Sequence, residues 1–290
     1  MSVISIFTPA YNRAQLLERL YISLSNQTNK SFEWIIVDDG SIDNTEETVR
    51  EFIKEKLISI TYYKQNNAGK HIAINKGVEL AKGELFFIVD SDDYLLENAI
   101  QFITQNYVKI KDDSSIAGLS LRKGYDKVTP IGSNNFNAPI LANVFAFRFK
   151  YKIKGDMAEI VKTKVMKQYP FPKIDEERFL TEGLVWNRIG LKYKMLWFPE
   201  ICYIAEYLEG GLSDNSFKLR KKFPKGSVLF YKELQNMPIS LFYKIRANIN
   251  YWRFAKYNQD SFYQNWKSVN CLYSIIGLPL SLIFLIKDKN

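Results

Sequence analysis

The feature that most constrains the fold is a regular alternation of two kinds of segment over residues 3–110. Short runs rich in β-branched and aromatic side chains alternate with stretches whose apolar residues recur at helical spacing. We expect strands at residues 3–8, 32–39, 58–63 and 84–90, and helices at residues 14–25, 44–56, 70–83 and 96–110. This order predicts an α/β fold with a Rossmann-like, mostly parallel, doubly wound sheet.

The rest of the chain divides into an irregular segment and a helical, basic one. Between residues 116 and 207, strands are expected at 144–149, 158–163 and 201–207, around a helix at 176–189. Beyond residue 214 the pattern is helical and rich in basic and aromatic side chains. We therefore expect a domain over residues 1–215, with halves at 1–115 and 116–215, followed by a helical extension at 216–290.

The composition excludes several classes of protein. The 290 residues include two cysteines, Cys202 and Cys271, and one histidine, His71, so neither a disulfide framework nor a zinc cluster is expected. The first residues lack the basic lead of a secretory signal. No segment reaches the ~20 apolar residues that span a bilayer. These features favour a protein of the reducing cytosol.

Polar side chains gather where three of the expected strands end. The stretches TPAYNR (8–13), VDDGS (37–41) and DSDD (90–93) follow the first, second and fourth strands. Ligands bind at the carboxyl ends of the strands in such sheets. Asp90 and Asp92 suit a hard divalent cation, which prefers oxygen ligands. Taken alone, each acidic stretch could instead form a turn and cap the next helix.

Taken together, these stretches resemble glycosyltransferase family 2, the inverting enzymes with the GT-A fold. The resemblance covers TPAYNR, VDDGSIDNT (37–45), NNAGKHIAINKG (66–77) and GELFFIVDSDD (83–93), in the order and spacing of the family. It implies transfer of a sugar from a nucleotide diphosphate sugar, with uridine the commonest nucleoside, to a hydroxyl of a glycan or lipid-linked saccharide. Residues 1–115 would then form the nucleotide-binding half and residues 116–215 the acceptor half.

The resemblance also implies roles for individual residues. Asp92 would bind Mn²⁺ or Mg²⁺, and Asp90 would contact the ribose, the metal or its water shell. Asp39 matches the aspartate that recognises the nucleobase. The remaining residues of the nucleotide-sugar site would be Thr8, Ala10, Tyr11, Arg13, Lys70, His71 and Ser91. For His71, a structural role with hydrogen-bonded ring nitrogens is the alternative.

Inversion requires a general base that takes the proton of the acceptor hydroxyl, and Glu182 is the candidate. It lies at the distance beyond DSDD where the family places its catalytic carboxylate, among apolar neighbours expected to raise its pKa. The family often has an acidic pair here, whereas Gly183 follows Glu182. A surface glutamate without a catalytic role is the alternative, and Asp156, Glu176 and Glu177 are the reserve candidates for the base. The stretch 206–215, with Gly210 and Gly211, resembles a loop that closes over the substrates.

The basic extension indicates a different partner. Residues 217–256 contain ten Lys or Arg and one acid, Glu233, and the chain continues into the apolar stretch 271–286. Nothing resembles a nucleic-acid-binding module. We therefore expect residues 217–286 to contact an anionic membrane surface, at the inner face of the bacterial cytoplasmic membrane. The alternative is a helical subdomain that buries these apolar residues.

Other functions are also compatible with a sheet of this kind. A nucleotidyltransferase that forms the sugar nucleotide would need a Gly-rich, Arg-bearing loop after the first strand, and TPAYNRAQ lacks it. A dinucleotide-dependent oxidoreductase would need G-x-G-x-x-G at that point. A nucleotide- or glycan-binding protein without a catalytic base stays open as an alternative.

Overall fold

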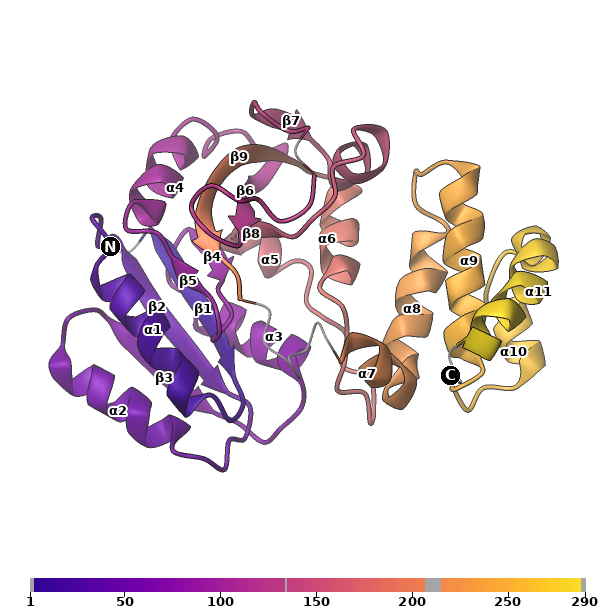
Figure 1. The fold of residues 1–290 in the computed structure, drawn as a ribbon, viewed down its shortest axis with the longest axis horizontal. Helices are drawn as coiled ribbons and strands as arrows, with labels where there is room; N and C mark the ends of the chain where they lie inside the picture. The colour runs from indigo at the N-terminus through magenta and orange to yellow at the C-terminus, as the bar shows by residue number, and fades with distance from the viewer. Residues whose placement is uncertain (1–2, 134, 207–214, 288–290) are drawn as a thin grey trace.

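The computed structural model describes residues 3–133, 135–206 and 215–287. A nine-stranded sheet forms its centre, and helices cover both faces of this sheet (Figure 1). The strands are β1 (Ile4–Ala10), β2 (Phe32–Asp38), β3 (Ile60–Lys64), β4 (Leu85–Ile88), β5 (Tyr94–Leu95), β6 (Ile116–Gly124), β7 (Ile140–Ala142), β8 (Met157–Lys162) and β9 (Lys194–Ile204). The helices of this part are α1 (Ala14–Ser25), α2 (Thr45–Glu55), α3 (Lys70–Leu80), α4 (Ala99–Tyr107), η1 (Ala146–Lys150), α5 (Thr163–Met166) and α6 (Gly183–Gly190).

The strands lie in the order β3-β2-β1-β4-β8-β6-β9-β5, and β7 pairs with β9. Strands β1 to β4 pair in parallel, and β6 and β9 run in the same direction as these four. Strands β8, β5 and β7 run the opposite way. The predicted α/β class with a largely parallel sheet is therefore confirmed.

Two apolar layers pack on opposite faces of the sheet, which makes it doubly wound. Helices α1, α2 and α4 bury residues such as Leu20 and Ile100 against one face. Helices α3, α5 and α6 bury residues such as Ile74 and Val185 against the other. Because successive side chains of a strand point to opposite faces, strands buried on both faces are apolar throughout. The near-continuous apolar runs of β1, β2 and β4 reflect this arrangement.

Two predicted elements differ from the structure. The strand expected at 144–149 is wrong, since this segment winds into helix η1. Asn143 accepts a hydrogen bond from the Ala146 amide and starts the turn, and Phe147 stacks on Trp197 with 3.9 Å between ring centroids. The helix expected at 176–189 begins only at Gly183, because the preceding residues form an irregular segment against the loop before α3.

The C-terminal helical unit comprises α7 (Ser216–Lys222), α8 (Pro224–Leu234), α9 (Leu241–Ala255), α10 (Phe262–Lys267) and α11 (Cys271–Lys287). It stands beside the sheet, with α8 next to α6 and with α10 and α11 at the far end (Figure 1). Arg188 of α6 forms a two-point ion pair with Glu233 of α8, at 2.9 and 2.6 Å. In the described part of the chain, no helix is both long enough and apolar enough to cross a membrane.

Candidate active site

The polar stretches found in the sequence meet at one edge of the sheet. Strands β1, β2 and β4 are parallel neighbours, with Ala10 in register with Asp38 and Phe7 in register with Ile88. Their carboxyl ends therefore open onto the same side of the molecule. The segments 8–13, 38–41 and 90–93 lie together there, although they are far apart in the sequence.

The turns that follow β1 and β2 are joined by hydrogen bonds that backbone amides donate. The Asp39 amide donates to the Ala10 carbonyl at 2.7 Å, and the Asn12 amide donates to Ser41 Oγ at 2.8 Å. This junction leaves the Tyr11 ring half exposed at the edge of the sheet and keeps Arg13 partly exposed beside it. Both side chains could thus contact a ligand at this edge.

Two other residues predicted to line the site are buried. The Thr8 hydroxyl accepts a hydrogen bond from Trp34 Nε1 at 2.9 Å, on the face of the sheet that α1 and α2 cover. Ala10 is also buried. A contact of either residue with a nucleoside would therefore have to involve its backbone.

Asp39 organises the loop that precedes α3. Its Oδ1 accepts hydrogen bonds from Gln65 Nε2 and the Ala68 amide, at 2.8 and 2.9 Å. Its Oδ2 accepts one from the Gly69 amide at 2.8 Å. Gly69 has a φ of +95°, and a Cβ there would lie 2.4 Å from the Arg178 carbonyl oxygen. A carboxylate keeps further acceptor capacity beyond three bonds, so recognition of a nucleobase by Asp39 stays a prediction.

Lys70, the first residue of α3, joins two acids from distant parts of the chain. Its Nζ lies 2.5 Å from Asp90 Oδ1 and 2.8 Å from Glu182 Oε1. Burial opposes the charge of Lys70, but the two carboxylates outweigh it and raise the pKa of the ammonium above its usual value. Burial likewise opposes ionisation of Asp90, yet Lys70 and Lys123 lower the pKa of this carboxyl.

The remaining acids of DSDD differ in their surroundings. Asp93 is buried and accepts hydrogen bonds from the Tyr203 hydroxyl at 2.5 Å and from the Glu206 amide at 2.9 Å. Burial and the charge of Asp90 raise the pKa of Asp93 to about 7. Asp92 is half-buried, and burial together with Asp90 raises its pKa as well. Ser91, which lies between Asp90 and Asp92 in the sequence, is buried.

Asp92 and Asp90 fit a divalent cation. Within the described residues, no hydrogen bond or ion pair joins the Asp92 carboxylate to another side chain, and Arg13 and Lys70 offset only part of the rise in its pKa that burial and Asp90 cause. No group of three or more His, Cys, Asp or Glu side chains in the same residues is arranged to hold a metal. Mg²⁺ and Mn²⁺ are often held by one or two carboxylates, with water and substrate phosphates completing the coordination. The two aspartates match that mode of binding.

His71 points into the core. It is 1% exposed, and neither ring nitrogen has a hydrogen-bond partner among the described residues. Burial lowers its pKa to about 4, so the ring is neutral at physiological pH. Its nearest aromatic neighbour is Phe171, which meets it edge-on. The hydrogen-bonded structural histidine that the sequence left open as an alternative is not observed.

Glu182 immediately precedes α6 and faces Lys70, whereas the reserve candidates for the base lie elsewhere. Glu177 is buried and accepts hydrogen bonds from the Gly226 and Phe179 amides, at 2.9 and 3.3 Å, which tie it to the start of α8. Glu176 is 85% exposed. Asp156 is exposed in the turn before β8. Glu182 is thus the candidate that the fold brings to the strand ends.

Sequence reasoning missed several residues at or near this site. Lys123, at the end of β6, lies 3.9 Å from Asp93 and over the Tyr203 ring. Glu159 of β8 is packed beneath α6, and burial raises its pKa to about 7, with Glu182 adding to the shift and Arg148 opposing it. The position of Lys123 at a strand end was the available signal, but the irregular pattern of residues 116–207 concealed that strand.

The predicted closing loop with Gly210 and Gly211 lies outside the described residues.

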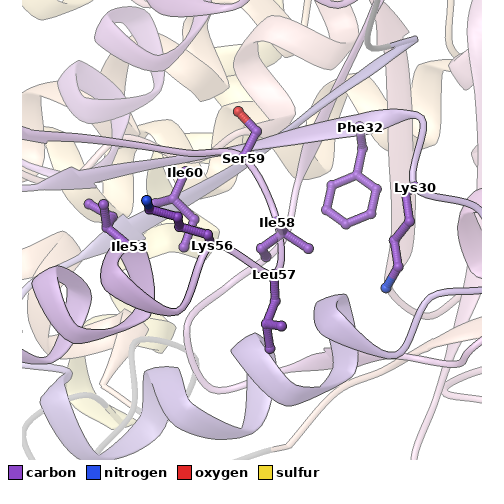
Figure 2. Close-up of a pocket in the computed structure, with 8 residues that line it drawn as sticks. All are labelled: Lys30, Phe32, Ile53, Lys56, Leu57, Ile58, Ser59 and Ile60. Carbon is purple, nitrogen blue, oxygen red and sulfur yellow. The ribbon is translucent and has the colours of Figure 1, made fainter.

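A hollow of about 460 Å³ lies at the opposite edge of the sheet. Lys30 precedes β2 and Phe32 begins it, Ile53 lies in α2, and residues 56–60 lead from α2 into β3 (Figure 2). The hollow is therefore at the amino ends of the strands. It contains none of the residues singled out from the sequence and is separate from the candidate site.

Comparison with known proteins establishes the family. Residues 5–166 match the model described as Glycosyl transferase family 2. Because this match covers more than half of the chain, the protein belongs to that family.

Two sequence relatives illustrate the range of the family. The chain is 30% identical over 194 residues to the poly(ribitol-phosphate) beta-N-acetylglucosaminyltransferase TarP of Staphylococcus aureus, a match that covers 64% of this chain and 58% of TarP. It is 24% identical over 301 residues to a GalNAc(5)-diNAcBac-PP-undecaprenol beta-1,3-glucosyltransferase of Campylobacter jejuni, covering 97% of this chain and 90% of the relative. For three of the curated relatives the matched part spans only 38% to 58% of their length.

Two solved structures share the fold. S. aureus TarS 1-349 in complex with UDP-GlcNAc superimposes with a TM-score of 0.62 and 21% identity, over 89% of this chain and 72% of that one. The mannosyltransferase PcManGT of Pyrobaculum calidifontis, in complex with GDP-Man and Mn²⁺, gives a TM-score of 0.57 and 15% identity, over 99% and 88%. The predicted GT-A fold is therefore confirmed.

Proposed function

We propose that the protein is a metal-dependent, inverting glycosyltransferase of bacterial polysaccharide biosynthesis. It moves a hexosyl or N-acetylhexosaminyl group from a nucleotide diphosphate sugar, in the first instance a UDP-sugar, to a hydroxyl of a glycan or lipid-linked saccharide. The observation that carries the proposal is the position of Lys70, whose ammonium contacts both Asp90 of the DSDD stretch and Glu182. A donor-binding acid and a candidate base thus face the same site.

Glu182 acts as the general base in this proposal. Its carboxylate takes the proton of the acceptor hydroxyl while the acceptor oxygen forms a bond to the anomeric carbon of the sugar. Attack opposite the leaving group inverts the configuration at that carbon. Lys70 holds the Glu182 carboxylate by its contact at 2.8 Å, so the base is oriented before the acceptor arrives.

The bond from the anomeric carbon to the phosphate oxygen breaks, and its electron pair leaves with the nucleoside diphosphate. Asp92 and Asp90 would hold Mn²⁺ or Mg²⁺, which supplies positive charge to the departing diphosphate. Lys70 and Arg13 lie at the same edge and add positive charge near Asp90. Tyr11, Ser91 and Asp39 would line the nucleoside side of the site.

The relatives support the substrate class. TarP is named for N-acetylglucosamine transfer to poly(ribitol-phosphate), and TarS was solved with UDP-GlcNAc. The C. jejuni relative is named for transfer to a saccharide on undecaprenyl diphosphate, a lipid carrier. PcManGT was solved with Mn²⁺. These names support a UDP-sugar donor, a glycan or lipid-linked acceptor and a divalent ion for this protein.

The division of the chain and its location belong to the same proposal. Residues 1–215 form the glycosyltransferase domain, and residues 216–290 form an extension that contacts an anionic membrane surface at the inner face of the cytoplasmic membrane. The ten Lys or Arg against one acid in residues 217–256 support this partner, since each basic residue near such a surface contributes about 1 kcal/mol.

The experiment is a screen of nucleotide sugars by thermal shift and by release of free nucleotide, with and without Mn²⁺. The wild-type protein should show a shift that needs both ligands. Glu182→Gln should keep that shift but lose about 100- to 10,000-fold in transfer or hydrolysis. Asp92→Asn should lose the metal-dependent part of the shift. Glu176→Gln, a change of the same type on an exposed neighbouring acid, is the matched control and should behave like the wild type.

The outcomes separate the alternatives. Full activity in Glu182→Gln would remove Glu182 as the base, and binding without any turnover in the wild type would favour a non-catalytic binding protein. A full metal-dependent shift in Asp92→Asn would refute the metal assignment. Formation of a sugar nucleotide from a sugar phosphate and a nucleoside triphosphate would support the nucleotidyltransferase alternative.

A further inference from the structure

Helix α11 packs on α9 through small residues. Ser274, Gly277 and Ser281 recur at helical spacing and are all buried. A Cβ at Gly277 would lie 2.1 Å from Asn248 Oδ1 of α9, so any larger residue would force the Asn248 side chain or the helices to shift. Asn248 Nδ2 and Trp252 Nε1 both donate to Ser274 Oγ, at 3.1 and 3.0 Å. Small residues and interhelical hydrogen bonds are typical of helix contacts within membranes.

The opposite side of α11 is apolar and exposed, which reverses the usual pattern of a helix in water. We call this side the outer face of α11. Its residues and their exposed fractions are Leu272 (72%), Ile275 (64%), Ile276 (48%), Leu282 (54%) and Ile283 (53%). Such a concentration of large apolar side chains on one face marks a contact surface for an apolar phase or partner.

The neighbouring helices add aromatic and basic side chains around this face. Phe262 and Tyr263 of α10 are 61% and 64% exposed, and α10 lies next to α11 (Figure 1). Lys267 Nζ of α10 lies 4.3 Å from the centre of the Tyr263 ring. Apolar side chains bordered by aromatics and cations are the composition of an interfacial helix.

We infer that the outer face of α11 inserts into the acyl-chain region of an anionic bilayer, with the helix lying in the plane of the membrane. This inference deepens the membrane contact proposed above, from attraction at the surface to insertion of one defined face. The 17 residues of α11 are about 25 Å long, too short for a perpendicular crossing of a ~30 Å hydrocarbon layer, and Pro279 lies within the helix.

A second copy of the chain is the competing occupant of this face. The unit that carries the face has ten Lys or Arg and one acid in residues 217–256, so two copies packed face to face would bring like charges together. An anionic leaflet offers the complementary charge. Charge therefore favours lipid over self-association.

The test is flotation of the full protein with phosphatidylcholine vesicles that contain or lack phosphatidylglycerol. The variant Leu272→Ser/Ile275→Ser/Ile283→Ser removes apolar surface from the outer face. Its matched control is Leu57→Ser/Val128→Ser/Leu191→Ser, three residues with 58%, 83% and 59% exposure on the sheet domain. We expect the outer-face variant to lose about 100-fold or more in partitioning to anionic vesicles, because the removed apolar area no longer leaves water. The control should stay near wild type.

Depth and oligomeric state complete the test. A fluorophore on Ile276→Cys in a Cys271→Ser background, with Cys202 buried, should shift to shorter wavelength and be quenched by brominated acyl chains. If salt abolished binding to the vesicles and the fluorophore stayed in water, insertion would be overturned. Attachment at the membrane surface would then remain. A lipid-free dimer that the outer-face variant converts to monomers would show that a second copy covers the face, and would overturn the inference.

Nucleotide release from the sugar nucleotide in detergent-free buffer should be unchanged in the outer-face variant, so failure here is distinguishable from failure of the proposed reaction.

Discussion

The sheet domain and the C-terminal helical unit arrange their side chains in opposite ways. In α1, Leu17, Leu20 and Leu24 point inward with no exposed surface. In α11, the small residues Ser274, Gly277 and Ser281 point inward, whereas the five Leu and Ile side chains of the outer face are exposed. The two helices therefore differ in where they place large apolar side chains: α1 buries most of them, whereas α11 exposes many of them.

The two regions also differ in whether the polar groups that they bury are charged. The sheet domain brings Lys70, Asp90 and Glu182 together in a partly buried cluster at the strand ends. The buried polar groups of the helical unit are neutral amides and hydroxyls, such as Asn248 with Ser274. Because a buried charge is costly unless paired, the three charged groups of this cluster contact one another.

The largest expected difference between the two regions is in the free energy of unfolding that is lost when an apolar side chain is truncated. The comparison is made on the protein in aqueous solution. Leu20→Ala should lower the free energy of unfolding by about 2–5 kcal/mol, because it leaves a cavity in a packed core. Ile276→Ala, on the outer face of α11, should change it by less than about 0.5 kcal/mol. Urea unfolding of both variants measures the difference. A cost above about 2 kcal/mol for Ile276→Ala would mean that a protein surface already covers the face.

A pH effect should arise in the sheet domain, through His71. The unfolded chain binds a proton at the usual histidine pKa of about 6.5, whereas the folded protein does so only near pH 4. Between these values the unfolded state holds more protons, so stability contributed by the neutral ring above pH 6.5 is lost as the pH falls toward 4. The loss is at most about 3 kcal/mol.

The measurement is simplified because His71 is the only histidine. Its ring resonances in NMR should show no titration above about pH 5. In His71→Gln, the loss of stability between pH 6.5 and 4 that the histidine ring causes should be absent. Titration near pH 6.5 would place the ring in solvent and contradict the packed position.

The smallest expected effect tests the contact between α9 and α11. Gly277→Ala should cost about 1–2 kcal/mol even though alanine favours helices, because the added Cβ meets Asn248. The double variant with Asn248→Ala should cost less than the sum of the two single changes, as neighbouring sites are coupled. Thermal unfolding and near-UV circular dichroism would report both. A stabilising Gly277→Ala would show that the helices are not in close contact.

Much of the sheet domain could be predicted from local pattern. The four alternating units of residues 3–110 were recognisable because strand and helix periodicities are short-range properties of the chain. The clusters at Asp39 and at Asp90–Asp92 could be placed at one edge because parallel strands end together. The prediction of a strand at 144–149 is wrong because apolar content alone cannot distinguish a strand from a buried helical turn.

The contacts that define the site depended on packing between distant segments. Nothing in the local pattern indicated that Lys70 contacts Glu182, because the segment before α6 is irregular and is placed by its contact with the Gly69 loop. The hydrogen bonds that occupy Asp39 and the burial of His71 were equally hidden.

The order of residues was thus enough to define the doubly wound sheet and the acidic edge, because both follow from repeating patterns a few residues long. It was not enough to orient α11. Residues 271–286 are largely apolar, and the helical spacing of Ser274, Gly277 and Ser281 carries no preference for placing these small residues inward or outward. The packing of Gly277 against Asn248 supplies that preference, since close approach of two helices requires the smallest side chains at the contact and turns the large ones away.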